Sequence, residues 1–342
     1  MKRKEIGSST RRNIRFGLVG AGGIAQAYVQ AFDESKCCEL GAVADIRTEA
    51  ATALAEIAGC ESYADYQQLA DLKLDAVIVA TPPVSHPEIT VFFAERGISV
   101  LCEKPLCLSA EDAERMIAAA KKNNVLFTMA SKFRYCEDVI KAKGILASGV
   151  LGEVLHFENA FTAKVDMSRR WNSDPAVSGG GVLIDNGTHS VDIIRYFMGA
   201  IDAVLVVDTG GTQGLSVEEN VKMFARTGVN VIASVDLAWG INKELPYFIS
   251  IYGTNGTIHV GWRESKYRLN SSPDWTIIGK GYDKAASFKA KIENFSNALK
   301  GEEDLYITPS DALASVQVIE AAYKSLNQDL WQPVAEKALA VK

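Results

Sequence analysis

Short, largely apolar runs recur along the first third of the chain and alternate with longer segments of helical spacing. The runs occupy residues 14–19, 39–44, 76–80, 98–102 and 125–129. Continuous apolarity, without a polar residue at every second position, is typical of strands covered on both faces, as in a parallel sheet between helices. Helices are predicted in the intervening segments, at residues 24–32, 48–57, 87–96 and 110–123. The pattern predicts a doubly wound α/β region.

After a predicted helix at residues 137–147, the pattern changes to alternation of apolar and polar positions. Further strand-like runs are separated by turn signals such as Asn255-Gly256 and occupy residues 155–161, 203–207, 221–225, 229–237, 247–252 and 257–260. Consecutive strands joined by tight turns predict a largely antiparallel open sheet with helices on one face, an α+β arrangement. A closing helix is predicted at residues 309–326, capped by Thr308 and beginning with Pro309.

Composition and charge limit the kinds of molecule that this protein is expected to bind. Apolar residues make up 48% of the sequence and charged residues 23%, the balance of a globular protein with ample core material. No apolar run approaches the length of about 20 residues that crosses a bilayer. The formal charge of −6 is spread along the chain, without a basic stripe that would attract nucleic acid. We therefore expect a small-molecule partner, no nucleic acid and no membrane.

The cysteines argue against a metal site. All six lie between residues 37 and 136, with no Cys-x-x-Cys pair and no zinc-ligand spacing. We find no export signal and expect these thiols to be reduced and mostly buried. This expectation favours a cytoplasmic protein without a metal.

A glycine-rich turn between the first predicted strand and helix is the first candidate for chemistry. Residues 20–25 match the pattern G-x-G-x-x-A. Gly20 permits a tight turn, and Gly22 lets the backbone approach a pyrophosphate. Gly23 and Ile24 complete the loop, and small Ala25 allows the helix to pack closely. Between a strand and a helix, this motif predicts a dinucleotide site.

Together with this motif, the α/β pattern of the first third and the α+β pattern of the rest predict two domains. A chain of 342 residues exceeds what one core usually holds. We expect a flexible leader at residues 1–13 and a Rossmann dinucleotide-binding domain at residues 14–132. A C-terminal α/β domain for substrate binding and oligomerisation is expected at residues 133–342.

Asp45 bears on the choice of dinucleotide. It ends the second predicted strand, where an acidic residue would meet the ribose hydroxyls of an adenosine. The alternative is a capping aspartate before the next helix. A carboxylate would repel a 2′-phosphate, which favours NAD. Arg47 keeps NADP open, because its guanidinium can pair with that phosphate.

Thr81 and Pro82 follow the strand at residues 76–80, at the carboxyl edge of the sheet where open α/β folds bind ligands. The prolines fix the exit of the chain, so we expect a rigid loop near the cofactor. His86 is a weaker cofactor candidate, since its place just before a helix favours a structural role.

Glu103 and Lys104 leave the next strand at the same edge. Pro105 restricts the backbone of Lys104, and the peptide between them can be cis, which would aim the ammonium into the cleft. Alone, such a lysine would be expected to be an exposed charge. A downstream pair of residues changes that expectation.

That pair is Asp185 and His189, which follow a run of three glycines. Four-residue spacing places both on one face of a helical turn. Oxidising a secondary alcohol needs a base for the hydroxyl proton, and imidazole titrates near working pH. The Lys104 ammonium can polarise the oxygen or relay the proton, and a carboxylate can hold neighbouring hydroxyls. His189 is the predicted base; the alternative is a histidine satisfied inside a helix.

Polar and aromatic residues in two other segments are candidates for gripping a substrate. Lys132, Arg134 and Tyr135 follow the last predicted strand of the parallel sheet. Arg169 and Trp171 precede the glycine run. For each of them, a solvated loop with one packed aromatic ring is an equally good interpretation.

Taken in order, these residues resemble the Gfo/Idh/MocA oxidoreductase family. The matching segments cover nearly the whole chain and include residues 20–25, Asp45, Thr81-Pro82, Glu103-Lys104-Pro105, 144–152, 179–199, 252–257 and the closing helix. One departure is Pro83, where many members have asparagine.

The resemblance implies a tightly held nicotinamide dinucleotide, sugars or cyclitols as substrates, and Lys104, Asp185 and His189 as catalytic residues. Two alternatives stay open: a non-catalytic NAD(P)-binding regulator on the same scaffold, and an NAD-dependent glycosidase. We also expect a homodimer or homotetramer formed through the uncovered face of the C-terminal sheet.

Overall fold

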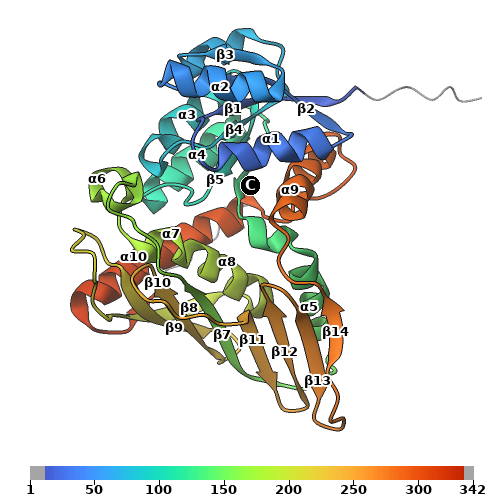
Figure 1. Ribbon diagram of the computed structural model, residues 1–342, viewed down its shortest axis with the longest axis vertical. Coiled ribbons are helices and arrows are strands. Elements are labelled where there is room, and N and C mark those ends of the chain that lie inside the picture. Colours follow the sequence, from blue (N-terminus) through green and yellow to red (C-terminus); the bar gives the residue numbers. More distant parts are fainter. Residues whose placement is uncertain (1–11, 335–342) are drawn as a thin grey trace, which may run out of the picture.

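The computed structural model describes residues 12–334, so the predicted leader lies almost entirely outside the described residues. Figure 1 shows two lobes, each built around one sheet, as the sequence predicts. Within residues 12–334, no helix combines the length and the apolar character needed to span a membrane.

The first lobe holds a parallel sheet of six strands in the order β3-β2-β1-β4-β5-β6. Its strands are β1 (Ile14–Val19), β2 (Cys38–Ala44), β3 (Glu61–Tyr63), β4 (Ala76–Val79), β5 (Ser99–Glu103) and β6 (Phe127–Ala130). Phe16 and Leu18 of β1 are buried in the core on one face, and Val19 is buried in the core on the other. Both faces are thus covered, which explains the continuous apolarity of the strands.

Helices from both ends of the chain cover this sheet. One face packs against α1 (Ala25–Glu34), α2 (Thr48–Ala58) and α9 (Lys284–Leu299). The other packs against α3 (His86–Ala94), α4 (Ala110–Lys122) and the first half of α10 (Pro309–Gln328). Helix α9 was not predicted from the sequence, although its Phe288, Ile292 and Phe295 have helical spacing and are buried. Two helices of the predicted second domain therefore help to form the cores of the first lobe.

The second lobe holds nine strands in the order β14-β13-β12-β11-β7-β10-β9-β8-β15. They are β7 (Val154–Thr162), β8 (Ile201–Asp208), β9 (Asn220–Thr227), β10 (Ile232–Ala238), β11 (Tyr247–Gly253), β12 (Gly256–Gly261), β13 (Ser265–Leu269), β14 (Thr276–Gly279) and β15 (Gln332–Pro333). Neighbouring strands are antiparallel except β7 and β10, which run parallel. The sheet is largely antiparallel, as predicted.

One face of this sheet packs against helices that lie between it and the first lobe (Figure 1). These helices are α5 (Glu137–Ala147), α7 (Val182–Asp185), α8 (Gly187–Met198) and the second half of α10. Two shorter elements lie near the junction of the lobes, η3 (Lys132–Tyr135) and α6 (Pro175–Ser178). This layering places the start of α8 against the carboxyl edge of the parallel sheet.

Candidate active site

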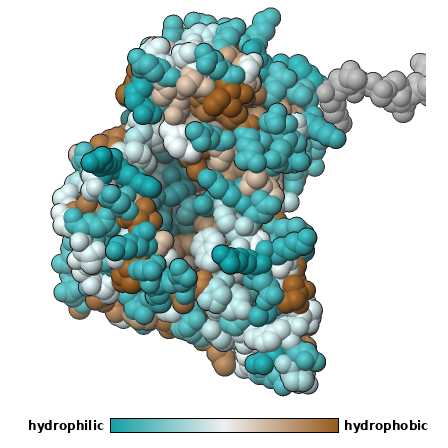
Figure 2. Space-filling view, viewed as in Figure 1, coloured by the Kyte–Doolittle hydropathy of each residue, from teal (hydrophilic) through white to brown (hydrophobic). Residues whose placement is uncertain are grey.

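A cleft of about 760 Å³ opens between the two lobes. Figure 2 shows the hollow on the near face, rimmed mostly by hydrophilic residues. The structure brings most of the predicted site residues to its walls, namely Gly22, Gly23, Ile24, Thr81, Glu103, Lys104, Lys132, Arg169, Trp171, Asp185 and His189. Residues far apart in sequence thus share one cavity.

The glycine loop has the backbone that a dinucleotide needs. Gly20 has φ of 103°, and a Cβ there would lie 2.6 Å from the carbonyl oxygen of Ala80, so only glycine fits. A Cβ on Gly22 or Gly23 would meet no atom within 4 Å, so these residues leave open space beside the start of α1. The N-terminus of a helix next to bare backbone is suited to a pyrophosphate.

Asp45 lies beside this loop. Its carboxylate accepts hydrogen bonds from the backbone amides of Ala21, at 2.7 Å, and Arg47, at 2.8 Å. Burial would raise the pKa of Asp45, but these two amides and the Arg47 guanidinium bring it below the ordinary value. The charge is therefore kept next to the nucleotide loop. Arg47 is exposed and contacts Asp45 through Nε at 3.3 Å.

Lys104 is held by Asp185 across the lobes. Its Nζ donates to Oδ1 of Asp185 at 2.6 Å and to the Asp185 backbone carbonyl at 3.1 Å. The Lys104–Pro105 peptide is cis, as the sequence analysis anticipated. The ion pair joins the end of β5 to the end of α7 and is only partly exposed.

Glu103 is a support for this loop. It accepts hydrogen bonds from the Tyr28 hydroxyl at 2.6 Å and the Lys291 ammonium at 3.0 Å, and its other oxygen accepts from the Lys104 amide. Burial would raise the pKa of Glu103, but Lys291 and Tyr28 bring it below the ordinary value. Neither partner was predicted from the sequence, because Tyr28 and Lys291 lie on α1 and α9, far from Glu103 along the chain.

His189 lies in the first turn of α8 and is 6% exposed. Its ring packs against Phe133 and Phe161, with centroids 4.9 and 6.0 Å apart. Burial, followed by the positive charges of Lys104, Lys132 and Lys291, lowers its pKa well below the ordinary value. Within residues 12–334 its Nδ1 has no hydrogen-bond partner. The imidazole is therefore neutral near pH 7 and can accept a proton.

Besides Gly20, Asp45 and Arg47 of the nucleotide loop and its surroundings, two further predicted cofactor residues, Pro82 and His86, lie outside the walls of the cleft. His86 is buried, with Nε2 2.7 Å from the Thr81 carbonyl oxygen and Nδ1 3.1 Å from the Pro105 carbonyl oxygen. It joins the Thr81 loop to the Lys104 loop, which agrees with the structural alternative given for it. Pro82 caps the short turn after β4.

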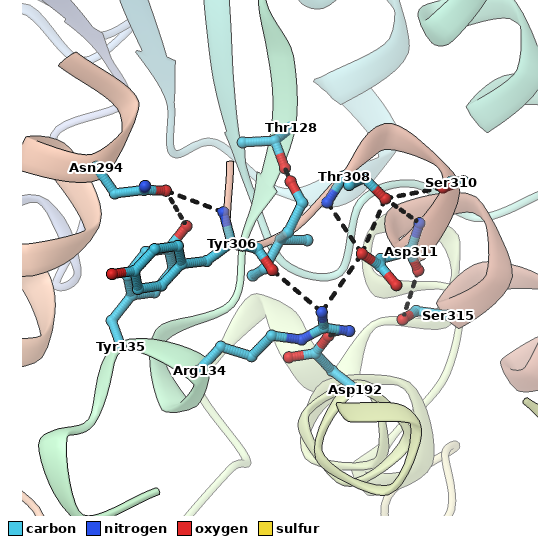
Figure 3. A network of polar contacts seen from close by, with 11 residues as sticks. Thr128, Arg134, Tyr135, Asp192, Asn294, Tyr306, Thr308, Ser310, Asp311 and Ser315 are labelled. Carbon is cyan, nitrogen blue, oxygen red and sulfur yellow. Dashed lines mark hydrogen bonds and ion pairs between the residues drawn. The ribbon is translucent and has the colours of Figure 1, made fainter. Parts of the chain in front are cut away.

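Arg134 and Tyr135 also lie away from the cleft, in the buried network of Figure 3. Arg134 pairs with Asp192 of α8 at 2.8 Å and contacts Asp311 of α10 at 3.4 Å. Tyr135 stacks on Tyr306 with ring centroids 5.4 Å apart. The short turn of η3 points these side chains into the protein, so the structure does not bring them to a substrate.

Several cleft residues were not predicted. Phe161, Trp239 and Trp262 supply apolar walls, and Lys284 comes from α9. Phe161 belongs to the strand predicted at residues 155–161, but the pattern did not indicate a cavity there. Nothing local marked Lys284, because its helix was missed.

The cleft combines a nucleotide loop, a neutral imidazole and an ammonium paired with a carboxylate. Such a set can remove a proton from a hydroxyl and stabilise the negative oxygen that results. Within residues 12–334, no cluster of three His, Cys, Asp or Glu residues could hold a metal ion.

Comparison with known proteins agrees with this chemistry. Residues 14–131 match the model "Oxidoreductase family, NAD-binding Rossmann fold", and residues 139–259 match the GFO/IDH/MocA C-terminal domain. The rhizopine catabolism protein MocA of Rhizobium meliloti is 27% identical, over 92% of this chain and 96% of that protein. Inositol 2-dehydrogenase of Rhizobium meliloti (strain 1021) is 25% identical, over 92% and 97%.

Solved structures show the same fold. A levoglucosan dehydrogenase in complex with NADH and levoglucosan superposes with a TM-score of 0.88, at 22% identity. The match covers 95% of this chain and 100% of that one. Both lobes of this chain therefore have the same fold and arrangement as that structure.

Proposed function

The chain belongs to the Gfo/Idh/MocA family of NAD-binding oxidoreductases, and from this premise we propose how its own cleft works. The protein transfers a hydride between a nicotinamide dinucleotide and a secondary hydroxyl of a sugar or cyclitol. Inositol 2-dehydrogenase and levoglucosan dehydrogenase, among its relatives, are named for such substrates. Lys104, Asp185 and His189 are the proposed catalytic residues.

The observation that carries the proposal is the shared position of these side chains. The Lys104–Asp185 ion pair, at 2.6 Å, and the neutral imidazole of His189 line the same cleft as Gly22 and Gly23. A regulator that only binds the dinucleotide would have no need of this arrangement.

Each side chain has a distinct part in alcohol oxidation. A bound nicotinamide ring supplies the hydride acceptor. His189 accepts the hydroxyl proton, since its lowered pKa keeps it neutral. Lys104 stabilises the developing negative charge on the substrate oxygen, and Asp185 fixes the ammonium and can accept a hydrogen bond from a neighbouring hydroxyl. In reduction of a ketone the proton moves in the opposite direction.

We propose NAD as the usual cofactor, bound with Gly20, Gly22, Gly23, Ile24 and Thr81, with Asp45 at the adenosine ribose. The negative charge of Asp45 supports this choice, and NADP remains the alternative that Arg47 would serve. Lys132, Arg169 and Trp171 are proposed to contact the substrate, because they line the cleft.

We also propose a cytoplasmic homodimer or homotetramer that forms through the outer face of the second sheet. That face carries polar and aromatic side chains, including a His259 ring stacked on Tyr247 at 4.4 Å. The described cysteines are all free thiols, which suits a reducing compartment.

The test is NADH formation, followed at 340 nm, with NAD and a panel of sugars and cyclitols. We expect turnover with at least one member, and a loss of about 10²-fold or more in kcat for His189→Ala and Lys104→Met. The matched control is Lys141→Met, because Lys141 is exposed on α5 and lies outside the cleft. Undiminished turnover by His189→Ala would remove its proposed role.

A further inference from the structure

We propose that the sugar this cleft accepts carries a carboxylate or phosphate group, which is recognised by Lys132 with help from Arg169 and Arg170. The inference rests on the proposed function and names its substrate class. The Lys132 ammonium in the cleft has no carboxylate of the described residues as its counter-ion.

Lys132 is a cleft cation that has no carboxylate partner among residues 12–334. It lies at the start of η3, directly after β6, and lines the cleft near His189. Its Nζ lies 5.0 Å from the ring centroid of Phe133 and 5.3 Å from that of Tyr282. Within residues 12–334 it has no carboxylate at salt-bridge distance. Burial removes water from the Lys132 ammonium. Contacts with two aromatic rings replace only part of the interaction energy that this water provided.

The other charges of the cleft do not neutralise it. The cationic side chains on its walls belong to Lys104, Lys132, Arg169, Arg170 and Lys284, and the anionic ones to Glu103 and Asp185. Both carboxylates already have partners. Asp185 pairs with Lys104, and the buried Glu103 pairs with Lys291. The walls therefore carry an excess of positive charge.

Part of this excess belongs to the cofactor end. Lys284 lies with Gly23 and Gln26 in a neighbouring hollow at the start of α1, where the dinucleotide phosphates are expected. Lys132 instead lies at the His189 end, because its neighbour Phe133 packs on the His189 ring. Arg169 and Arg170 line the same cavity and have Asp166 as a nearby negative charge.

The titration of these groups agrees with a positive potential at the substrate end. Burial, followed by the charge of Lys104, lowers the pKa of Lys132 to about 8. The Glu103 carboxylate opposes this shift, and the charges of Lys291 and Lys284 add to it. Lys132 in turn lowers the pKa of His189. An anionic group of the substrate beside Lys132 would accept a charge-assisted hydrogen bond from its ammonium. This bond would replace the interactions with water that Lys132 loses on burial.

The experiment compares matched acidic and neutral sugars on the NAD-loaded protein. The pairs are D-glucuronate with D-glucose and D-glucose 6-phosphate with D-glucose, measured by calorimetric binding to the NADH complex and by kcat/KM for NAD reduction. We expect tighter binding of at least one acid than of glucose. Whichever acid is favoured identifies the group as carboxylate or phosphate.

Lys132→Gln should lower the acid-to-neutral ratio by about tenfold or more, as expected for loss of a charge-assisted hydrogen bond. In the wild type this ratio should fall as pH rises above about 8, where Lys132 loses its proton. Arg169→Gln should lower the ratio less, because Arg169 is more exposed. Lys141→Gln is the control, since its ammonium pairs with Glu137 on the outer surface of α5.

Three results would overturn the inference: no acid-selective binding by the wild type, an equal effect of Lys132→Gln on acid and glucose, or an effect of that variant only on the Kd for NADH. Equal effects would mean that Lys132 stabilises the reacting oxygen of any substrate. In each case NADH formation with a neutral sugar would leave the proposed oxidoreductase activity standing. Failure of every sugar and cyclitol to reduce NAD would instead count against that activity.

Discussion

At the scale of single residues, burial beside lysines gives His189 different proton affinities in the folded and unfolded chain. Its pKa is lowered well below the ordinary value in the fold, whereas an unfolded histidine titrates near about 6.5. Below about pH 6.5 the unfolded chain therefore binds a proton that the folded chain does not. The free energy of unfolding must fall as pH drops through this window.

We predict that this loss is smaller in His189→Gln than in the wild type. Below about pH 6.5 the free energy of unfolding of the wild type should fall by up to about 1.4 kcal/mol more per pH unit than that of the variant. Above this pH the two proteins should show the same pH dependence. Urea unfolding between pH 5 and 8 measures the difference. His86, whose pKa burial also lowers, affects both proteins equally and cancels. Parallel curves down to pH 5 would contradict a depressed pKa for His189.

Asp45 gives a second prediction at this scale, on the choice of cofactor. Asp45→Asn keeps one side-chain oxygen, which can accept from either the Ala21 or the Arg47 amide but not from both, and it removes the charge that repels a 2′-phosphate. The ratio of kcat/KM for NAD to that for NADP should fall by about tenfold, equivalent to about 1.4 kcal/mol. Asp71→Asn, at an exposed position of the first lobe, is the control. An unchanged ratio would mean that Asp45 only caps its loop.

At the scale of elements, Arg134 is the point where η3, α8 and α10 meet (Figure 3). Arg134→Met would leave Asp192, which has no exposed surface, without its cation. We predict a loss of about 3–5 kcal/mol in the free energy of unfolding by urea. Arg115→Met is the matched control, because its ion pair with Asp112 is on the surface of α4 and should cost about 0–1 kcal/mol.

The double variant Arg134→Met/Asp192→Leu separates charge from packing. Burial raises the pKa of Asp192 and Arg134 opposes that rise, so removing both groups removes the buried charge as well as its partner. The double variant should be more stable than Arg134→Met alone. If it is no more stable, the loss in Arg134→Met comes from packing.

The same elements show how far sequence reasoning reaches. The parallel strands were predicted because consecutive residues such as Leu18 and Val19, which face opposite sides of the sheet, are both apolar. The start of α10 was predicted from Thr308 followed by proline, and in the structure Thr308 forms a capping box with Asp311. Lys104 and Asp185 were predicted to share a site because their motifs follow the nucleotide loop in the order typical of the family. Arg134 was a candidate for substrate contact because it follows the last parallel strand. The sequence could not show that it meets Asp192 and Asp311, which are distant along the chain. Local sequence patterns indicate where turns lie and which side of a strand or helix is buried. They cannot show which distant carboxylate pairs with a buried arginine.

The two lobes depend on each other through α9 and α10. Phe295 of α9 packs in one core of the first lobe, and Leu313 of α10 packs in the other. Ile319, later in α10, belongs to the core of the second lobe. One continuous helix is thus part of the hydrophobic cores of both lobes, so loss of either core removes support from the other. We infer that the lobes unfold together.

The tryptophans allow a direct test of this coupling. All five lie at position 171 or later, in or beside the second lobe, whereas the proposed NAD site is on the glycine loop of the first. NAD at 100 times its Kd should stabilise the folded state by about 2.7 kcal/mol. If the lobes unfold as one unit, tryptophan fluorescence and far-ultraviolet circular dichroism will give the same urea midpoint, and NAD will raise both equally. A fluorescence transition that NAD leaves in place would show that the second lobe unfolds independently, despite the shared α10.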